Sequence, residues 1–125
     1  MAGKYHRVLI VEDDATLRGL ISRNLSARGH EITEAETAAD ALKLLEARAP
    51  DLLLLDINLP DQSGWHVLRQ IDGKEIPTVI ISAVRVSQAR LSEFKPLAYL
   101  PKPFPLEALL RIVENGHTPE GEAEP

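Results

Sequence analysis

Short apolar segments alternate along the chain with longer segments whose apolar residues recur at helical spacing. The most apolar of the short segments is a run of leucines over 52–55, which follows Pro50 and leads directly into Asp56. A run this short and continuous is typical of a strand buried on both faces, as in the centre of a parallel sheet. The strands expected from these segments are 7–11, 30–35, 52–56, 78–82 and 98–100.

Capping residues mark the ends of the helical segments. Asp14 is a suitable N-cap for the first helix, and Gly29 supplies its stop. Thr37 begins a sequence that resembles a capping box, and Ser87 is placed to cap a fourth helix of at most about two turns. The helices expected are 15–28, 37–48, 65–72, 87–94 and 105–115.

This alternation predicts an α/β fold with a doubly wound, five-stranded parallel sheet and helices on both faces. The flavodoxin-like strand order 2-1-3-4-5 is preferred, because it places the two most apolar strands, the first and the third, side by side at the switch point. Ligands bind at the carboxyl ends of strands in such sheets. Residues 12 and 13 follow the first strand and Asp56 ends the third, so the functional site is expected there.

Composition narrows the class of protein. The 125 residues suit a single domain, which we expect over 1–116, and 117–125 carry three Glu and no large apolar residue, which favours a disordered acidic tail. The absence of cysteine excludes disulfides and thiolate metal sites, and no apolar run has the length of a membrane span. A net charge of −5 argues against direct nucleic-acid binding. We therefore expect a cytoplasmic protein without a membrane or nucleic-acid partner.

The expected site combines acids, a hydroxyl and an ammonium. Glu12, Asp13 and Asp56 would repel one another and raise at least one pKa unless a cation is present, and Mg²⁺ suits a small set of oxygen ligands. Ser82 ends the fourth strand, and Lys102 lies between two prolines after the fifth. Together these groups predict phosphoryl transfer to Asp56 as the nucleophile, with the metal and Lys102 neutralising phosphoryl oxygens.

Each of these residues also has a structural interpretation. Glu12 and Asp13 could be acids at a helix N-terminus, and Ser82 could be a turn hydroxyl. Lys102 could be a solvated surface charge, and Tyr99 could simply pack on an edge strand. The four histidines are scattered without the spacing of metal ligands and are given no role.

Four motifs follow the expected strands in order, and together they resemble the receiver domain of bacterial two-component response regulators, the CheY-like family. The resemblance covers residues 7–116. The motifs are Glu12-Asp13, Asp56 with Pro60 and Gly64, Ser82-Ala83, and Lys102-Pro103-Phe104.

The resemblance implies that Asp56 accepts a phosphoryl group from a histidine kinase or phosphotransfer protein in a Mg²⁺-dependent reaction. The implied catalytic residues are Asp56, Ser82 and Lys102. The implied Mg²⁺ ligands are Asp13, Asp56 and the backbone carbonyl of Asn58, with Glu12 acting mainly through water. The implied phosphate-binding residues are Asn58, Ser82, Ala83 and Lys102.

The resemblance also implies a switch. Ser82 and Tyr99 would couple phosphorylation to the surface formed by the fourth helix, fifth strand and fifth helix, which would bind a downstream protein or effector domain or form a phosphorylation-dependent homodimer. Ser82 and Lys102 are 102 − 82 = 20 residues apart, slightly fewer than the family pattern, and Lys95-Pro96 replaces its usual Gly-Ala. The fourth helix is therefore the least certain element, and we expect 84–96 to be the most mobile internal segment.

Two other functions compete with this one. The leucine run leading into Asp56 also resembles the strand and nucleophile of haloacid-dehalogenase-type phosphatases, although position 58 is Asn where that chemistry needs a second Asp. A receiver-like interaction module that is never phosphorylated would have the same fold. We expect a switch that catalyses only its own phosphorylation and dephosphorylation, not a turnover enzyme.

Overall fold

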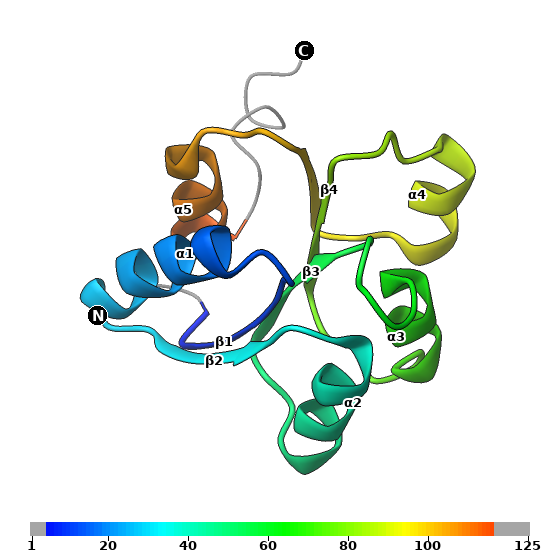
Figure 1. Ribbon diagram of the computed structural model, residues 1–125, viewed down its shortest axis with the longest axis horizontal. Helices are drawn as coiled ribbons and strands as arrows, with labels where there is room; N and C mark the ends of the chain where they lie inside the picture. The colour runs from blue at the N-terminus through cyan, green and yellow to red at the C-terminus, as the bar shows by residue number, and fades with distance from the viewer. Residues whose placement is uncertain (1–4, 117–125) are drawn as a thin grey trace.

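Within the residues described by the computed structural model, 5–116, five parallel strands form a central sheet and five helices cover it (Figure 1). The tail expected over 117–125 lies outside the described residues. The strands are β1 (Arg7–Val11), β2 (Glu31–Ala35), β3 (Leu52–Asp56), β4 (Thr78–Ser82) and β5 (Ala98–Pro101). The helices are α1 (Ala15–Ala27), α2 (Ala38–Ala47), α3 (Gly64–Gln70), α4 (Gln88–Phe94) and α5 (Leu106–Asn115).

The strand order is β2-β1-β3-β4-β5, which confirms the predicted topology. Val8 of β1 is in register with Leu52 of β3, and Val11 with Leu55. Asp56, the last residue of β3, is in register with Ile81 of β4. The carboxyl ends of β1, β3 and β4 therefore meet at one edge of the sheet, where the polar residues follow.

The helices form two layers. Figure 1 shows α1 and α5 on one face of the sheet and α2, α3 and α4 on the other. The leucines of β3 divide between these layers: Leu52 and Leu54 join the core under α1 and α5, and Leu53 and Leu55 join the core under the other three helices. All four are fully buried, and burial of each contributes on the order of 2 kcal/mol. This double burial explains why β3 has no polar position before Asp56.

The predicted caps begin three of the helices. The Asp14 side chain accepts backbone N–H groups of Thr16 and Leu17, and the hydroxyls of Thr37 and Ser87 cap α2 and α4. α3 ends at Gln70 and not at residue 72 as predicted, because the chain already leaves helical geometry at its C-cap, Ile71. These caps fix where each strand-end loop becomes a helix.

The uncertain fourth helix is present over seven residues. The helix ends at Phe94, and its C-cap is Lys95, whose φ of 48° lies in the left-handed region that glycine usually occupies at helix ends. No helix in the described part of the chain is long and apolar enough to cross a membrane.

Candidate functional site

The structure brings the three predicted acids together. Glu12 and Asp13 directly follow β1 and Asp56 ends β3, and one carboxylate oxygen from each lies within 4.8 Å of the other two. Glu12 is fully buried and Asp56 is 2% exposed, whereas Asp13 is open to solvent. We call these three residues the acidic cluster.

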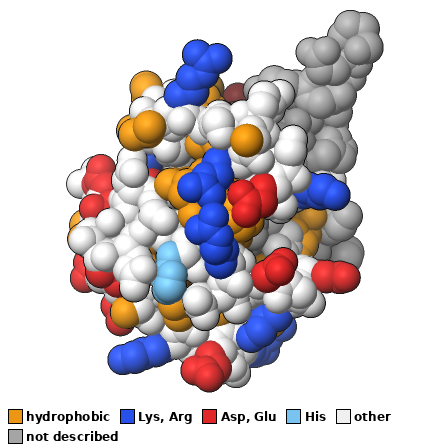
Figure 2. Space-filling model, turned by 90° about the vertical axis from the view of Figure 1, so that its right-hand side faces the viewer, with side chains coloured by type: hydrophobic (Ala, Val, Ile, Leu, Met, Phe, Trp, Pro, Cys, Tyr) orange, Lys and Arg blue, Asp and Glu red, His pale blue; other side chains and the backbone are white. Residues whose placement is uncertain are grey.

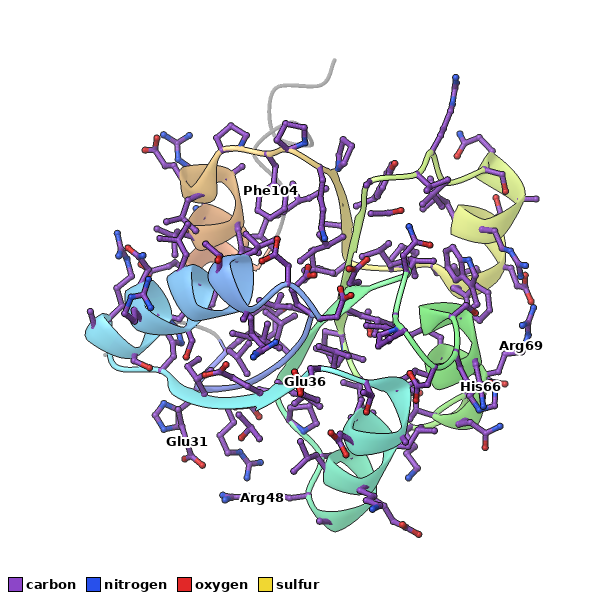
Figure 3. The ribbon with its side chains drawn as sticks, viewed as in Figure 1. Glu31, Glu36, Arg48, His66, Arg69 and Phe104 are labelled. Carbon is purple, nitrogen blue, oxygen red and sulfur yellow. The ribbon has the colours of Figure 1, made fainter. Side chains whose placement is uncertain are left out.

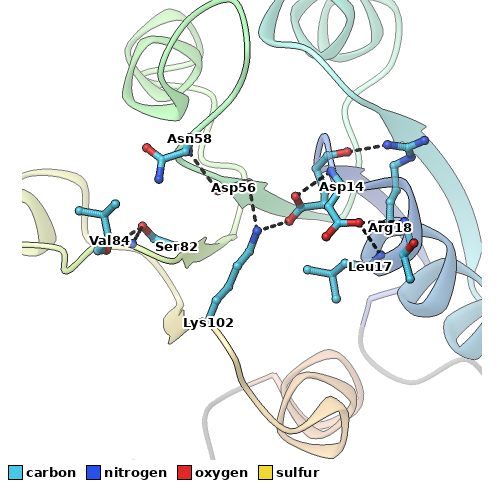
Figure 4. Close-up of polar contacts among 10 residues, drawn as sticks. Asp14, Leu17, Arg18, Asp56, Asn58, Ser82, Val84 and Lys102 are labelled. Atoms are coloured by element: carbon cyan, nitrogen blue, oxygen red, sulfur yellow. Dashed lines mark hydrogen bonds and ion pairs between the residues drawn. The ribbon is translucent and has the colours of Figure 1, made fainter.

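Lys102 supplies the cation of the site. Its Nζ lies 2.8 Å from Glu12 Oε1 and 3.1 Å from Asp56 Oδ2 (Figure 4). The backbone N–H of Lys102 donates to the carbonyl of Ser82 at 2.8 Å, which fixes the start of this side chain beside the end of β4. One ammonium thus faces two buried carboxylates.

Burial dominates the electrostatics of Glu12. Its pKa is raised from 4.5 to about 7, and desolvation by burial is the largest cause. Hydrogen bonds from Lys102 and the Asp14 N–H oppose the shift, and the neighbouring Asp56 charge adds to it. Repulsion among the acids was the predicted cause, yet burial is the larger one. Burial lowers the pKa of Lys102, but its contacts with both carboxylates outweigh that effect and leave the pKa above its usual value.

The acidic cluster fits a hard divalent cation. All of its donors are carboxylate oxygens, and the exposed position of Asp13 leaves one side open for the waters that Mg²⁺ retains. When all three acids are ionised, the single Lys102 ammonium leaves a net charge of −2, from −3 + 1, in a largely buried site. A bound dication would neutralise that excess charge.

The β3–α3 loop holds the other oxygen of Asp56. The backbone N–H of Asn58 donates to Asp56 Oδ1 at 3.0 Å, so the two oxygens of this carboxylate have different partners. The loop then closes tightly at Gly64, whose N–H donates to the Ile57 carbonyl at 2.7 Å. A Cβ at Gly64 would lie 2.7 Å from the Asp56 backbone oxygen, so the predicted glycine is required by close approach.

Ser82 is oriented toward its own loop. Its hydroxyl donates to the Val84 carbonyl at 2.7 Å and accepts the Val84 N–H at 3.0 Å, while Ala83 between them is exposed. The Tyr99 hydroxyl accepts the N–H of Val86 at 3.4 Å. The two predicted switch residues therefore contact the same β4–α4 loop, at two different points.

A cavity of about 380 Å³ opens beside the site between the β3–α3 and β4–α4 loops. Its lining includes Asn58, Trp65, Ser82, Arg85 and Arg90. Figure 4 shows Asn58 and Ser82 on one side of Asp56 and Asp14 on the other. Asp56 thus lies between the side chains that line this cavity and the β1–α1 loop, which contains Asp14.

Sequence reasoning missed two residues around the site. Arg18 of α1 donates from Nη1 to the Glu12 carbonyl at 2.7 Å. Asp61, in the β3–α3 loop, accepts the N–H groups of Ala38 and Ala39, and these bonds lower its pKa. Both contacts are made to backbone atoms, which every residue possesses, so no residue pattern marks them.

The chain matches the sequence profile of the response regulator receiver domain over residues 8–114. It is 34% identical to the response regulator MprA of Mycobacterium avium, covering 94% of this chain and 55% of MprA. It is also 34% identical to the DNA-binding transcriptional regulator NtrC of Escherichia coli, covering 86% of this chain and 24% of NtrC. The chain therefore spans about half the length of one relative and about a quarter of the other.

Solved structures share the fold. The non-phosphorylated HemR receiver domain from Leptospira biflexa superposes with a TM-score of 0.80 at 32% identity, covering 87% of this chain and 91% of that one. Response regulator TrrA from Thermotoga maritima, solved in complex with Mg(2+)-BeF, has a TM-score of 0.76 at 31% identity, covering 87% of this chain and 96% of that one.

Proposed function

The chain belongs to the response regulator receiver family of two-component signalling, and from this premise we propose that Asp56 is its phosphoacceptor. The supporting observation is the environment of Asp56. One carboxylate oxygen contacts Lys102 Nζ, the other accepts the Asn58 N–H, and Glu12 and Asp13 lie within metal-binding distance. A buried carboxylate oriented in this way is positioned to act as a nucleophile.

In the proposed reaction an Asp56 oxygen attacks the phosphorus of a phosphohistidine on a kinase or phosphotransfer protein. The new P–O bond forms as the P–N bond breaks, and the electron pair remains on the imidazole nitrogen, which takes a proton from water. Mg²⁺ held by the acidic cluster and the Asn58 carbonyl would neutralise phosphoryl oxygens, with Glu12 acting mainly through water. Lys102 would transfer its contact from Asp56 to a phosphoryl oxygen.

Phosphate binding requires the β4–α4 loop to change. The Ser82 hydroxyl, now bonded to Val84, would turn to a phosphoryl oxygen, and the Ala83 N–H would donate to another. Release of Val84 would alter the loop that also binds the Tyr99 hydroxyl through Val86. We propose that this loop transmits the signal to α4 and β5 and from there to a downstream protein, an effector domain or a second copy of the chain.

Two observations favour a switch over the phosphatase alternative. Position 58 carries an amide, which cannot act as the second acid, and its backbone N–H is committed to Asp56. The Lys102 ammonium contacts the nucleophile directly and would stabilise the aspartyl phosphate. We therefore propose self-phosphorylation from a donor followed by slow self-dephosphorylation, without turnover of other phosphate esters.

The test is incubation with phosphoramidate, with and without Mg²⁺, followed by intact-protein mass spectrometry. Wild type should gain one phosphoryl group only with Mg²⁺, and Asp56→Asn should gain none. Asp51→Asn is the matched control, because Asp51 precedes the other end of β3, where its carboxylate accepts the Arg7 N–H. Equal labelling of wild type and Asp56→Asn would refute the assignment; no labelling of wild type would favour an unphosphorylated interaction module. Steady release of phosphate from p-nitrophenyl phosphate would favour the phosphatase.

A further inference from the structure

Arg18 is a largely buried arginine that none of the roles above uses. It extends from the first turn of α1 back across the β1–α1 loop, and its side chain is 17% exposed. Nη1 donates to the Glu12 carbonyl oxygen at 2.7 Å (Figure 4). Nε donates to Glu34 Oε1 at 2.9 Å. The planar guanidinium thus bridges the residue after β1 to a residue in β2.

The bond to Glu12 completes a clamp on one short piece of backbone. The Glu12 N–H donates to the Ala35 carbonyl at 3.0 Å, and the Glu12 carbonyl accepts from Arg18. The Glu12 carboxylate accepts the Asp14 N–H through Oε2 at 3.1 Å. The backbone on both sides of this Cα is therefore restrained.

This clamp acts on Asp13 as well. The carbonyl carbon of Glu12 and the nitrogen of Asp13 share one planar peptide unit, so fixing the Glu12 oxygen also limits the direction in which the Asp13 side chain leaves the backbone. Asp13 is the exposed member of the acidic cluster, whereas Glu12 and Asp56 are held by burial and by Lys102. Among the three, Asp13 therefore depends most on its backbone for orientation.

The charge of Arg18 is compensated elsewhere. Glu34 pairs with Nε, and Glu36 Oε1 lies 4.0 Å from Nη1. The bond to Glu12 is made to a backbone oxygen and not to a carboxylate of the cluster. Arg18 is thus arranged to position the loop without competing with a metal for its ligands.

We propose that Arg18 is a positioning residue for the divalent-cation site: by holding the Glu12–Asp13 peptide it presets the Asp13 carboxylate for Mg²⁺. This inference rests on the Mg²⁺ site of the proposed function. It assigns no contact between Arg18 and the metal. Loss of a group that orients a metal ligand typically costs about 10- to 100-fold in metal affinity.

The test is direct Mg²⁺ titration of the full chain by calorimetry, without phosphodonor. Arg18→Met should weaken Mg²⁺ binding about tenfold or more. Arg23→Met is the matched control, because Arg23 is an exposed arginine of the same helix, and it should bind as wild type does. Glu34→Gln separates positioning from the ion pair: it weakens the Arg18–Glu34 contact, leaves the Glu12 bond, and should change affinity less than twofold.

The proposal would be overturned if folded Arg18→Met bound Mg²⁺ as tightly as wild type. It would also be overturned if Glu34→Gln lost as much Mg²⁺ affinity as Arg18→Met. If Arg18→Met does not fold, Arg18→Lys provides the same test, since lysine keeps the charge but cannot span Glu34 and Glu12 with one rigid fork. It should show a several-fold loss, and unchanged affinity would overturn the proposal. A wild-type chain that binds no Mg²⁺ would overturn both this inference and the proposed metal site, whereas Mg²⁺ binding without labelling of Asp56 would overturn the phosphoacceptor assignment alone.

Discussion

The rings of Trp65 on α3 and Phe94 on α4 stack with their centroids 5.1 Å apart and their planes inclined by 23°. The guanidinium of Arg90 lies 5.2 Å from the Trp65 centroid, and that of Arg69 lies 5.5 Å from the Phe94 centroid. Figure 2 faces this side of the molecule, where blue side chains cross an orange apolar strip. α4 has no buried residue, so this stack is a principal attachment of the helix.

We predict that residues 84–96 exchange amide hydrogens faster than the rest of the described interior and gain protection when beryllofluoride and Mg²⁺ mimic phosphorylation. A seven-residue helix is unstable without packing, and its preceding loop carries both switch contacts. Hydrogen-exchange mass spectrometry would measure both effects. High and equal protection in the two states would leave α5 as the better candidate for output.

Phe94→Ala should speed exchange in α4 by roughly 2- to 10-fold, because an aromatic pair contributes about 0.5–1.5 kcal/mol beyond its buried area. Phe104→Ala is the matched control. Figure 3 shows Phe104 beside α5, and this partly buried ring packs against the core on the other face of the sheet. If both variants changed α4 equally, a general loss of stability would explain the result and the stack would have no special role.

The raised pKa of Glu12 predicts that Mg²⁺ affinity depends on pH. A carboxyl with a pKa of about 7 carries a proton below neutrality, and a cation must displace that proton. Calorimetric titrations between pH 6 and 8 should show affinity rising with pH, and Glu12→Gln should flatten the dependence. If Mg²⁺ affinity rose with pH as steeply in Glu12→Gln as in wild type, the displaced proton would belong to another group.

The same shift affects stability in the absence of metal. Glu12 has its folded-state pKa above its usual value of 4.5, so folding binds a proton, and the resulting stabilisation is complete below about pH 4.5 and lost as the pH rises to about 7. Urea unfolding of the metal-free wild type should show this decrease across the window. In Glu12→Gln the decrease should be smaller, and an unchanged pH profile would contradict the assignment.

Gly64→Ala should destabilise the protein by about 1–3 kcal/mol, because the new Cβ meets backbone atoms of Asp56 and Ile57 at 2.7 and 2.9 Å and neither can move freely. Gly19→Ala is the control: its Cβ meets only the flexible end of the Arg23 side chain, within helix α1, where alanine is favoured by about 1 kcal/mol. Denaturant unfolding of both variants should therefore give changes of opposite sign.

Val84→Glu should shorten the lifetime of the phosphorylated state by about tenfold, since a carboxylate there could orient an attacking water. Val84 is 59% exposed and contacts Ser82 through its backbone, so the side chain can change without disturbing that contact. Val84→Leu serves as the apolar control. Identical decay of the phosphorylated wild type and Val84→Glu would remove position 84 from the account of hydrolysis.

Much of the fold follows from local rules. The Asp14, Thr37 and Ser87 caps act within a few residues of themselves, and the leucines of β3 require cover on both faces, so the sequence alone predicts the elements and their order. The end of α3 and the left-handed Lys95 were not predicted, because tertiary packing and not propensity decides those positions.

The sequence predicted which residues form the candidate site but not how burial changes their electrostatics. Because Glu12, Asp56 and Lys102 lie at the carboxyl ends of parallel strands, they were predicted to meet, and they do. The complete burial of Glu12 was not predicted, since a glutamate after a strand has the same pattern whether it faces solvent or the interior. Arg18 was missed for a related reason: its partner is a backbone oxygen, which every residue possesses.

Lys102 directly follows β5, an edge strand of the sheet, and this position has a consequence for biosynthesis. The ribosome produces Glu12, Asp13 and Asp56 well before Lys102, so a nascent chain that has paired β1 with β3 carries its acids without their ammonium. Once β4 has paired with β3, its other edge stays unpaired until β5 is in place. Pairing of β5 covers that edge and brings Lys102 to the acids, so β5, the last strand of the described sheet in chain order, completes both the sheet and the site.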